Sequence, residues 1–315
     1  MARKNVTEQL QPNDAGLARA AEILVSGHLV AVPTETVYGL AARADAAEAV
    51  ARIYAAKGRP SFNPLIVHVK NLTQAEMLAR FDANARKLVE RFWPGPLTMV
   101  LPLRDDAGLA PAVSAGLSTI ALRQPAHPTM RALLDQLDFP LAAPSANRSE
   151  AVSPTKPEHA MASLGGRCPA VVCDGATDAG LESTIVALRD NGAWSLLRPG
   201  PITKEQLEAE LGPEAKTTSG KVESPGQLAK HYSPGKPVRL NALQVAQDEF
   251  WIGFGEVEGD YNLSPISDLN NAAARLYGAL HLAGASEKAC IAVAPIPDEG
   301  IGQAINDRLS RAAAK

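Results

Sequence analysis

Apolar residues recur along the chain with a period that changes from segment to segment. Leu17, Ala20, Ala21 and Leu24 share one face of a helix that Gly27 stops, whereas residues 65–70 alternate as a half-buried strand does. The next helix would be capped by Asp45 and stopped by Gly58. Helices are predicted at 15–26, 45–56, 73–80, 84–92, 128–137, 157–164, 202–211, 270–283 and 301–314. Strands are predicted at 28–33, 65–70, 97–103, 118–123, 141–144, near 171, 183–188, 194–198, 250–254 and 290–293.

The order of these elements predicts two domains joined by a linker. Helices and strands that mix without strict alternation indicate an α/β or α+β sheet domain over residues 1–211. Residues 212–237 are rich in Gly, Pro, Ser and Lys and have almost no apolar periodicity, which is typical of a linker. Residues 238–315 are predicted to form a small three-layer α/β domain.

Composition limits the function. The 315 residues fit two domains, and the net charge of −3 argues against the global basic field that drives non-specific nucleic-acid binding. An anion site must therefore be built locally. Residues 1–13 are polar and no apolar run reaches the roughly 18 residues of a spanning helix, so we expect a cytoplasmic protein without membrane contact. Cys168, Cys173 and Cys290 form no CxxC pair, so buried reduced thiols are expected.

The loop that follows the first predicted strand is the first candidate site. The chain has no GxxxxGK[ST] motif, and no GxGxxG follows a predicted strand, so a nucleotide would have to be held by Lys, Arg and small hydroxyl side chains. In the string VPTETVYGL (32–40), Thr34 and Thr36 either cap backbone groups or face a ligand, and Gly39 would permit an unusual turn.

A compact cationic loop is the second candidate. Lys57 and Arg59 flank a glycine after a predicted helix, where they would either meet phosphate oxygens or complement the helix dipole. Arg123 and Arg198 each end a predicted strand. His68 on a strand would, taken alone, be a core residue.

A third loop is rich in small polar side chains. Ser145, Asn147, Ser149 and Ser153 lie within ten residues after a short predicted strand, where α/β proteins commonly bind ligands. A solvent-exposed loop is the alternative interpretation.

Taken together, these strings resemble the YrdC-type threonylcarbamoyl-AMP synthases in their longer form. The resemblance is carried by PTETVYGL (33–40), KGRPSFNPLIVHV (57–69), FWPGPLT (92–98), RQPAHP (123–128), APSAN (143–147), STI (183–185), RPGPI (198–202), HYSP (231–234) and a final AINDRL helix. It implies an α/β fold with a YrdC-like twisted mixed sheet, flanking helices and a concave basic cleft. A small Rossmann-like C-terminal α/β domain would follow.

The resemblance implies a reaction in which L-threonine, bicarbonate and ATP give L-threonylcarbamoyl-AMP and pyrophosphate. Mg²⁺ would accompany ATP without direct protein ligands. The product would pass to the transferase machinery that modifies adenosine 37 of tRNA, and a weak tRNA contact of this chain is left open.

The resemblance also assigns residues. It implies catalytic roles for Lys57 and Arg59. The ATP-binding set would be Lys57, Arg59, Asn63, Thr119, Ser145, Asn147, Ser153, Arg198 and Tyr232, the last folding back from the linker over the nucleotide. The threonine-binding set would be Thr36, His68, Arg123, Ala143 and Ser183, with Arg123 on the carboxylate. The chain departs from the family's usual residues at Phe62 and Gln124, which flank matched positions.

Two other functions are alternatives to the synthase. An RNA-binding module with a basic concave surface is disfavoured by the net charge and by the lack of interleaved basic and aromatic residues. A relative of carbamoyltransferases or hydrogenase-maturation proteins would carry acylphosphatase-like and Cys-rich zinc segments, which this sequence lacks.

Overall fold

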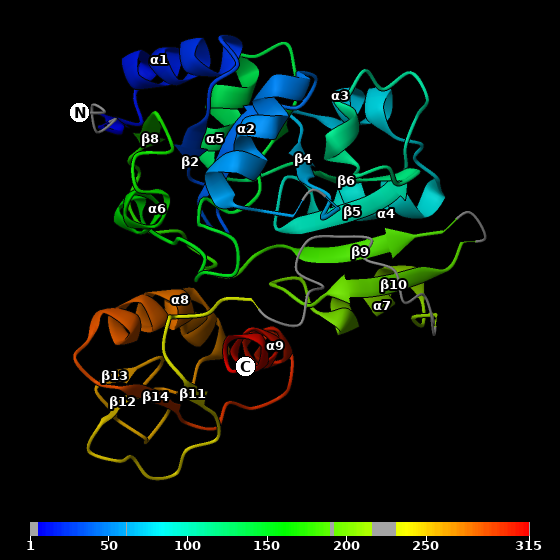
Figure 1. Ribbon diagram of the computed structural model, residues 1–315. Helices are drawn as coiled ribbons and strands as arrows, with labels where there is room; N and C mark the ends of the chain where they lie inside the picture. Colours follow the sequence, from blue (N-terminus) through cyan, green and yellow to red (C-terminus); the bar gives the residue numbers. More distant parts are fainter. Residues whose placement is uncertain (1–5, 61, 190–191, 216–230, 315) are drawn as a thin grey trace.

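The computed structural model describes residues 6–60, 62–189, 192–215 and 231–314, and these residues form two sheets (Figure 1). The larger sheet has the strand order β1-β8-β2-β3-β7-β4-β6-β5-β9-β10 among the described residues. Its strands are β1 (Glu8–Leu10), β2 (Val30–Val32), β3 (Gly39–Arg43), β4 (Ile66–His68), β5 (Leu97–Pro102), β6 (Thr119–Arg123), β7 (Leu141–Ala142), β8 (Ala170–Val172), β9 (Thr184–Leu188) and β10 (Trp194–Arg198). The sheet is mixed, since it contains parallel pairs such as β4 with β6 and antiparallel pairs such as β5 with β6.

Helices cover both faces of this sheet. They are α1 (Asp14–Val25), α2 (Ala47–Lys57), α3 (Leu72–Leu78), α4 (Ala83–Phe92), α5 (Pro128–Asp135), α6 (Pro157–Leu164) and α7 (Lys204–Leu211), with a 3₁₀ turn η1 at Pro111–Val113. Strand β2 shows how the faces divide, because Val30 and Val32 pack with α1 and α5 while Ala31 packs in the core that α2, α4 and α6 cover. The two-residue alternation of a strand produces this division.

Local sequence explains where several helices begin and end. Asn13 Oδ1 accepts from Gly16 N at 2.9 Å and caps α1. Gly58 ends α2 with φ of 62°, as predicted for a glycine stop. The predicted cap Asp45 was wrong, because Ala46 occupies the cap position and the Asp45 carboxylate accepts from Arg43 instead.

The smaller sheet has the order β11-β14-β12-β13 among the described residues and is parallel throughout. Its elements are β11 (Val238–Arg239), β12 (Glu249–Gly253), β13 (Tyr261–Asn262), α8 (Leu269–Ala285), β14 (Cys290–Val293) and α9 (Gly302–Ala312). Figure 1 shows both helices on the side of this sheet that faces the larger sheet. The predicted three-layer arrangement is therefore corrected to two layers. The apolar face of α8, including Leu276 and Leu280, packs on Ile291 and Val293 of β14.

Four short strands were not predicted. β1 lies in the polar N-terminal segment and pairs with β8, while β3 lies where a loop was expected to continue from the first strand. β11 and β13 have only two residues each, too few for a visible alternation. The three cysteines are free, and Cys168 is buried.

Candidate active site

A cleft lies where β4, β6 and loops of the larger domain meet the described end of the linker. The lining combines three arginines with small hydroxyl side chains and two aromatic rings from the described end of the linker. Its residues are Thr34, Thr36, Val37, Gly39, Arg59, Ile66, His68, Arg123, Ala143, Pro144, Ser145, Glu182, Ser183, Arg198, His231 and Tyr232.

All five residues of the predicted threonine set line this cleft. Along β4, Val67 enters the main core while Ile66 and His68 face the cleft, and His68 lies beside Arg123 of β6. Arg123 Nη1 donates to Thr36 Oγ1 at 2.8 Å. Burial, with a smaller contribution from Arg123, lowers the pKa of His68 to about 3, so the imidazole is neutral at pH 7.

The loop after β2 is braced by its own hydroxyl groups. Thr34 Oγ1 accepts from the backbone N–H groups of Thr36 and Val37 at 3.2 Å each, and it donates to Val37 O at 2.7 Å. Thr34 therefore caps backbone groups, as one of the two interpretations had it, while Thr36 is the hydroxyl that meets Arg123.

Gly39 has a different role from the predicted one. It begins β3 outside the left-handed region and forms an antiparallel bridge to Ser145. A Cβ at this position would lie 3.3 Å from Ala143 Cβ, so the absence of a side chain permits two backbones to approach closely. Leu40 N donates to Pro144 O at 2.6 Å along the same contact. The strings PTETVYGL and APSAN thus run side by side.

Lys57 lies beneath the cleft, with its ammonium group directed at the backbone of the third loop. Its Nζ donates to the carbonyl oxygens of Ser145 and Asn147, and Lys57 O accepts from Ser149 N at 2.8 Å. The side chain is 2% exposed, and this burial lowers its pKa well below the ordinary value. Lys57 therefore fixes the loop that carries Ser145.

Arg59 and Arg198 line the cleft from separate loops. Arg59 Nη2 donates to Pro64 O at 2.9 Å. Arg198 Nε and Nη2 donate to Ser183 O at 3.0 and 2.9 Å. Burial, and less strongly the charge of Arg198, lowers the pKa of Arg59 to about 10, and burial lowers that of Arg198. Both guanidinium groups are charged at pH 7.

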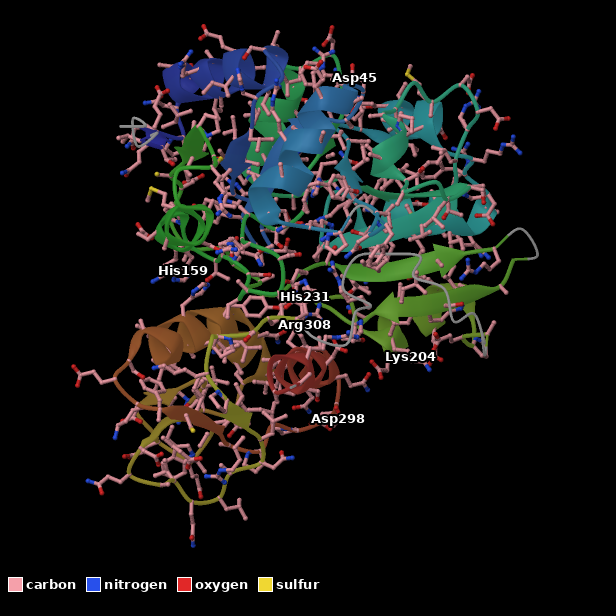
Figure 2. All side chains as sticks on the ribbon, in the orientation of Figure 1. Asp45, His159, Lys204, His231, Asp298 and Arg308 are labelled. Atoms are coloured by element: carbon pink, nitrogen blue, oxygen red, sulfur yellow. The ribbon has the colours of Figure 1, made fainter. Side chains whose placement is uncertain are left out.

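The described end of the linker reaches the cleft. Tyr232 is 1% exposed, its ring centroid lies 4.0 Å from that of His231, and it lies 5.5 Å from the ring of Tyr277 in α8. Figure 2 labels His231 at the junction of the two domains. Residues 216–230 of the predicted linker lie outside the described residues.

Five predicted nucleotide-binding residues do not line the cleft: Lys57, Asn63, Thr119, Asn147 and Ser153. Thr119 begins β6 at the end opposite Arg123, and four residues of strand span about 13 Å. Asn147 is buried, and its Nδ2 donates to the carbonyl oxygens of Arg148 and Ala151 at 2.8 Å each.

Comparison with known proteins matches this arrangement to one family. Residues 22–200 match the family model described as "Telomere recombination" of the Sua5, YciO and YrdC proteins, and residues 202–314 match "Threonylcarbamoyl-AMP synthase, C-terminal domain". The threonylcarbamoyl-AMP synthase of Bacillus subtilis is 42% identical, covering 98% of this chain and 96% of that protein. The chain belongs to the threonylcarbamoyl-AMP synthase family. It is thus an enzyme of the nucleotidyltransferase type.

Solved structures of threonylcarbamoyl-AMP synthases and their relatives show the same fold. The crystal structure of P. abyssi Sua5 complexed with L-threonine superposes with a TM-score of 0.87 at 31% identity, covering 98% of this chain and 97% of that one. Full-length HypF, in a phosphate- and nucleotide-bound form, matches with a TM-score of 0.53 and 21% identity. The match covers 59% of this chain and 30% of HypF, and at that identity it shows a likeness of fold alone.

Two buried carboxylates of this family member were missed by sequence reasoning. Glu35 Oε1 lies 2.6 Å from Arg123 Nη2. Burial alone would raise the pKa of Glu35, but Arg123 outweighs it and lowers that pKa. Glu182 lines the cleft beside Ser183. Glu35 lies within PTETVYGL and Glu182 directly before STI, and this position beside motif residues is the sequence signal that could have revealed them.

Some buried polar atoms without a hydrogen-bond partner belong to the cleft or to predicted site residues. Within the described part of the chain, His68 Nδ1 and Nε2 lie in the cleft wall, while Asn63 Oδ1 and Asn147 Oδ1 belong to predicted nucleotide-binding residues outside it. Such atoms are rare in folded proteins and are commonly found at functional sites. They are groups that a bound polar molecule could engage.

Two further structural findings concern metals and membranes. The described residues contain no group of three or more His, Cys, Asp or Glu side chains placed to hold a metal ion. None of the helices formed by the described residues is both long and apolar enough to cross a bilayer.

Proposed function

We propose that this chain joins L-threonine, bicarbonate and ATP into L-threonylcarbamoyl-AMP and pyrophosphate. One observation carries the proposal: a single cleft places Arg123, Thr36 and His68 beside Arg59 and Arg198. A carboxylate-bearing amino acid and a triphosphate both need such donors, since charge-assisted hydrogen bonds to Arg are among the strongest that proteins make.

The proposed threonine site uses the side chains that line the inner end of the cleft. Arg123 would bind the carboxylate while Thr36 orients its guanidinium group. Neutral His68 and the hydroxyl of Ser183, which lies 2.7 Å from Thr98 Oγ1, would receive the polar groups of threonine. The backbone of Ala143, whose N–H donates to Ile66 O at 3.0 Å, would form one wall.

The proposed chemistry has two steps. The free amine of threonine attacks bicarbonate to form a carbamate and water. A carbamate oxygen then attacks the α-phosphorus of ATP, the new O–P bond forms, and the α–β phosphate bond breaks to release pyrophosphate. Because a carbamate decomposes in water, the residues would act by holding the reactants together and excluding solvent.

The nucleotide would be bound by Arg59, Arg198, Ser145 and Tyr232, with Lys57 holding the loop of Ser145 in place. Mg²⁺ would enter with ATP and share the charge of its phosphates. Glu35 and Glu182, the buried carboxylates in or next to the cleft, are each paired with an arginine. Asn63, Thr119, Asn147 and Ser153 remain predicted nucleotide contacts.

We further propose that the product supplies the cytoplasmic machinery that modifies adenosine 37 of tRNA. The test of the activity uses the full chain with ATP, bicarbonate and labelled threonine. Pyrophosphate and a labelled nucleotide conjugate should form only when all three substrates are present. Pyrophosphate release without threonine would reject the proposal, and tRNA binding that ATP leaves unchanged would favour an RNA-binding role.

A further inference from the structure

We propose that Arg308, on the last helix of the smaller domain, is a positioning residue for the nucleotide site of the larger domain. It neutralises Glu182 and thereby leaves Arg198 available to an anionic ligand. The inference deepens the proposed function and rests on it for the identity of the ligand, ATP.

Arg308 crosses from one domain to the other. Its side chain is fully buried, and Nε donates to Glu182 Oε2 at 2.9 Å. Nη2 donates to Pro199 O at 3.0 Å, directly after Arg198, and Nη1 donates to Asp307 Oδ2 at 2.7 Å. Figure 2 shows Arg308 at the domain junction close to His231. A guanidinium fork with this many fixed partners is held in one orientation.

Glu182, the carboxylate that Arg308 binds, lies in the wall of the cleft. Its Oε2 also accepts from Tyr277 OH at 2.8 Å, and its Oε1 accepts from Ser153 Oγ. Burial by itself would raise the pKa of Glu182, but Arg308 and then Arg198 outweigh it and set that pKa at about 2. Glu182 is therefore a full negative charge within the wall of a cleft proposed to hold a triphosphate.

The partners of Arg198 show what this neutralisation achieves. Arg198 donates to the carbonyl and hydroxyl oxygens of Ser183 and, among the described residues, makes no ion pair with Glu182. After Arg308, Arg198 is the cation that most stabilises the charge of Glu182, so without Arg308 this buried charge would depend on Arg198, and a buried unpaired charge is costly. Glu182 would then compete with phosphate oxygens for Arg198 and repel them.

The same contacts include the aromatic ring that covers the cleft. The Arg308 guanidinium carbon lies 5.4 Å from the ring centroid of Tyr232, and Tyr232 stacks on Tyr277. Both residues of the smaller domain that bind Glu182 therefore also contact Tyr232. The smaller domain thus contacts Tyr232 and Glu182 of the cleft wall, whereas Arg123 has its side-chain contacts with Thr36 and Glu35 of the larger domain.

The experiment measures steady-state kinetics and ATP binding by calorimetry in the full chain. Arg308→Met should raise the KM for ATP about tenfold or more, since one uncompensated charge in a partly buried site changes binding by at least this factor. The KM for threonine should change less than about threefold, because Arg123, which would bind the threonine carboxylate, is paired with Glu35 and Thr36 and not with Glu182. Arg275→Met is the matched control, an exposed arginine of α8 that donates to Tyr261 OH.

A double variant separates charge compensation from a merely structural role. Adding Glu182→Gln to Arg308→Met removes the uncompensated charge, so the KM for ATP should return to within about threefold of the Glu182→Gln value. An unchanged KM for ATP in Arg308→Met, or losses that simply add in the double variant, would overturn the proposal.

Two controls keep the result interpretable. If Arg308→Met shows no cooperative unfolding transition, Arg308→Lys replaces it: a folded Lys variant should keep most of the ATP affinity, and a tenfold loss in it would overturn charge compensation. If the wild-type chain forms no threonylcarbamoyl-AMP, the proposed function fails, while calorimetric ATP affinities of the wild-type and Arg308→Met chains still decide the role of Arg308.

Discussion

The substitution Lys57→Met removes one ammonium group from beneath the cleft and changes the length of the side chain very little. In the wild-type chain, Nζ donates to the carbonyl oxygens of Ser145 and Asn147, and the side chain is 2% exposed. The variant therefore leaves two buried carbonyl oxygens without their donor. These oxygens belong to the loop that carries the predicted nucleotide contacts.

The expected magnitude follows from two opposing terms. Hydrogen bonds that involve a charged group contribute about 1.5–3 kcal/mol each, so the loss of both costs about 3–6 kcal/mol. Relief from burying the ammonium group offsets several kcal/mol of this loss. We expect the free energy of unfolding of the larger domain to fall by about 2–3 kcal/mol, and turnover to fall more than about tenfold because Ser145 and its neighbours shift.

The assay pairs urea unfolding with initial rates of pyrophosphate release. Lys87→Met is the control, because Lys87 is an exposed residue of α4 far from the loop in sequence. Lys57→Met should unfold at a lower urea concentration than this control and turn over more slowly. A Lys57→Met chain that matches the control in stability would refute the bracing of the loop, even if its activity were lost, because Lys57 would then act on the phosphates directly.

Three more predictions concern the cleft and the domain junction. Glu35→Gln leaves Arg123 without its buried partner. It should lower the free energy of unfolding by about 3 kcal/mol and raise the KM for threonine. An unchanged KM for threonine would show that Glu35 does not position Arg123. Tyr232→Ala should raise the KM for ATP roughly tenfold while the larger domain stays folded. If the variant and the wild-type chain have the same ATP affinity, Tyr232 only links the two domains and does not bind the nucleotide. Burial, and then the charge of neighbouring His281, lowers the pKa of His159 to about 3. The unfolded chain therefore takes up this proton at a higher pH than the folded chain, and stability falls as the pH drops from about 6.5 toward 3. His159→Phe should flatten this fall, measured as urea midpoints at pH 7 and pH 5; the same slope in both chains would contradict the assignment.

The longer elements of the fold could be predicted from the sequence because their patterns are local. The apolar face of α1 and the glycine that ends α2 each lie within one helix. The two-residue strands and β1 could not be predicted in this way. β1 is a strand because residues 170–172, far along the chain, pair with it, and no alternation within Glu8–Leu10 reveals that partner.

The cations and hydroxyls of the site could be predicted because they occur in recognisable strings, but their partners could not. Arg123 ends β6, yet its contacts are Thr36 and Glu35, which approach from a loop almost ninety residues earlier. Similarly, Lys57 was predicted as a phosphate contact, and its position beneath the loop of Ser145 becomes visible only when both segments are folded. Pairing across long sequence separations is a property of the tertiary structure.

The distribution of charge in the cleft explains why a chain with a net charge of −3 can present an anion site. Glu182 in the cleft wall and Glu35 next to the cleft are each paired with an arginine: Glu35 with Arg123, and Glu182 with Arg308. The second pairing draws its cation from the smaller domain, so it adds positive charge that the larger sheet does not supply. Arg308 of the smaller domain neutralises Glu182. Arg59 and Arg198 therefore remain in the cleft as positive charges without an acidic partner among the described ion pairs. The affinity of the cleft for a polyanion should therefore depend on the docking of α9, and a chain lacking residues 238–315 should lose ATP affinity even where the larger domain remains folded.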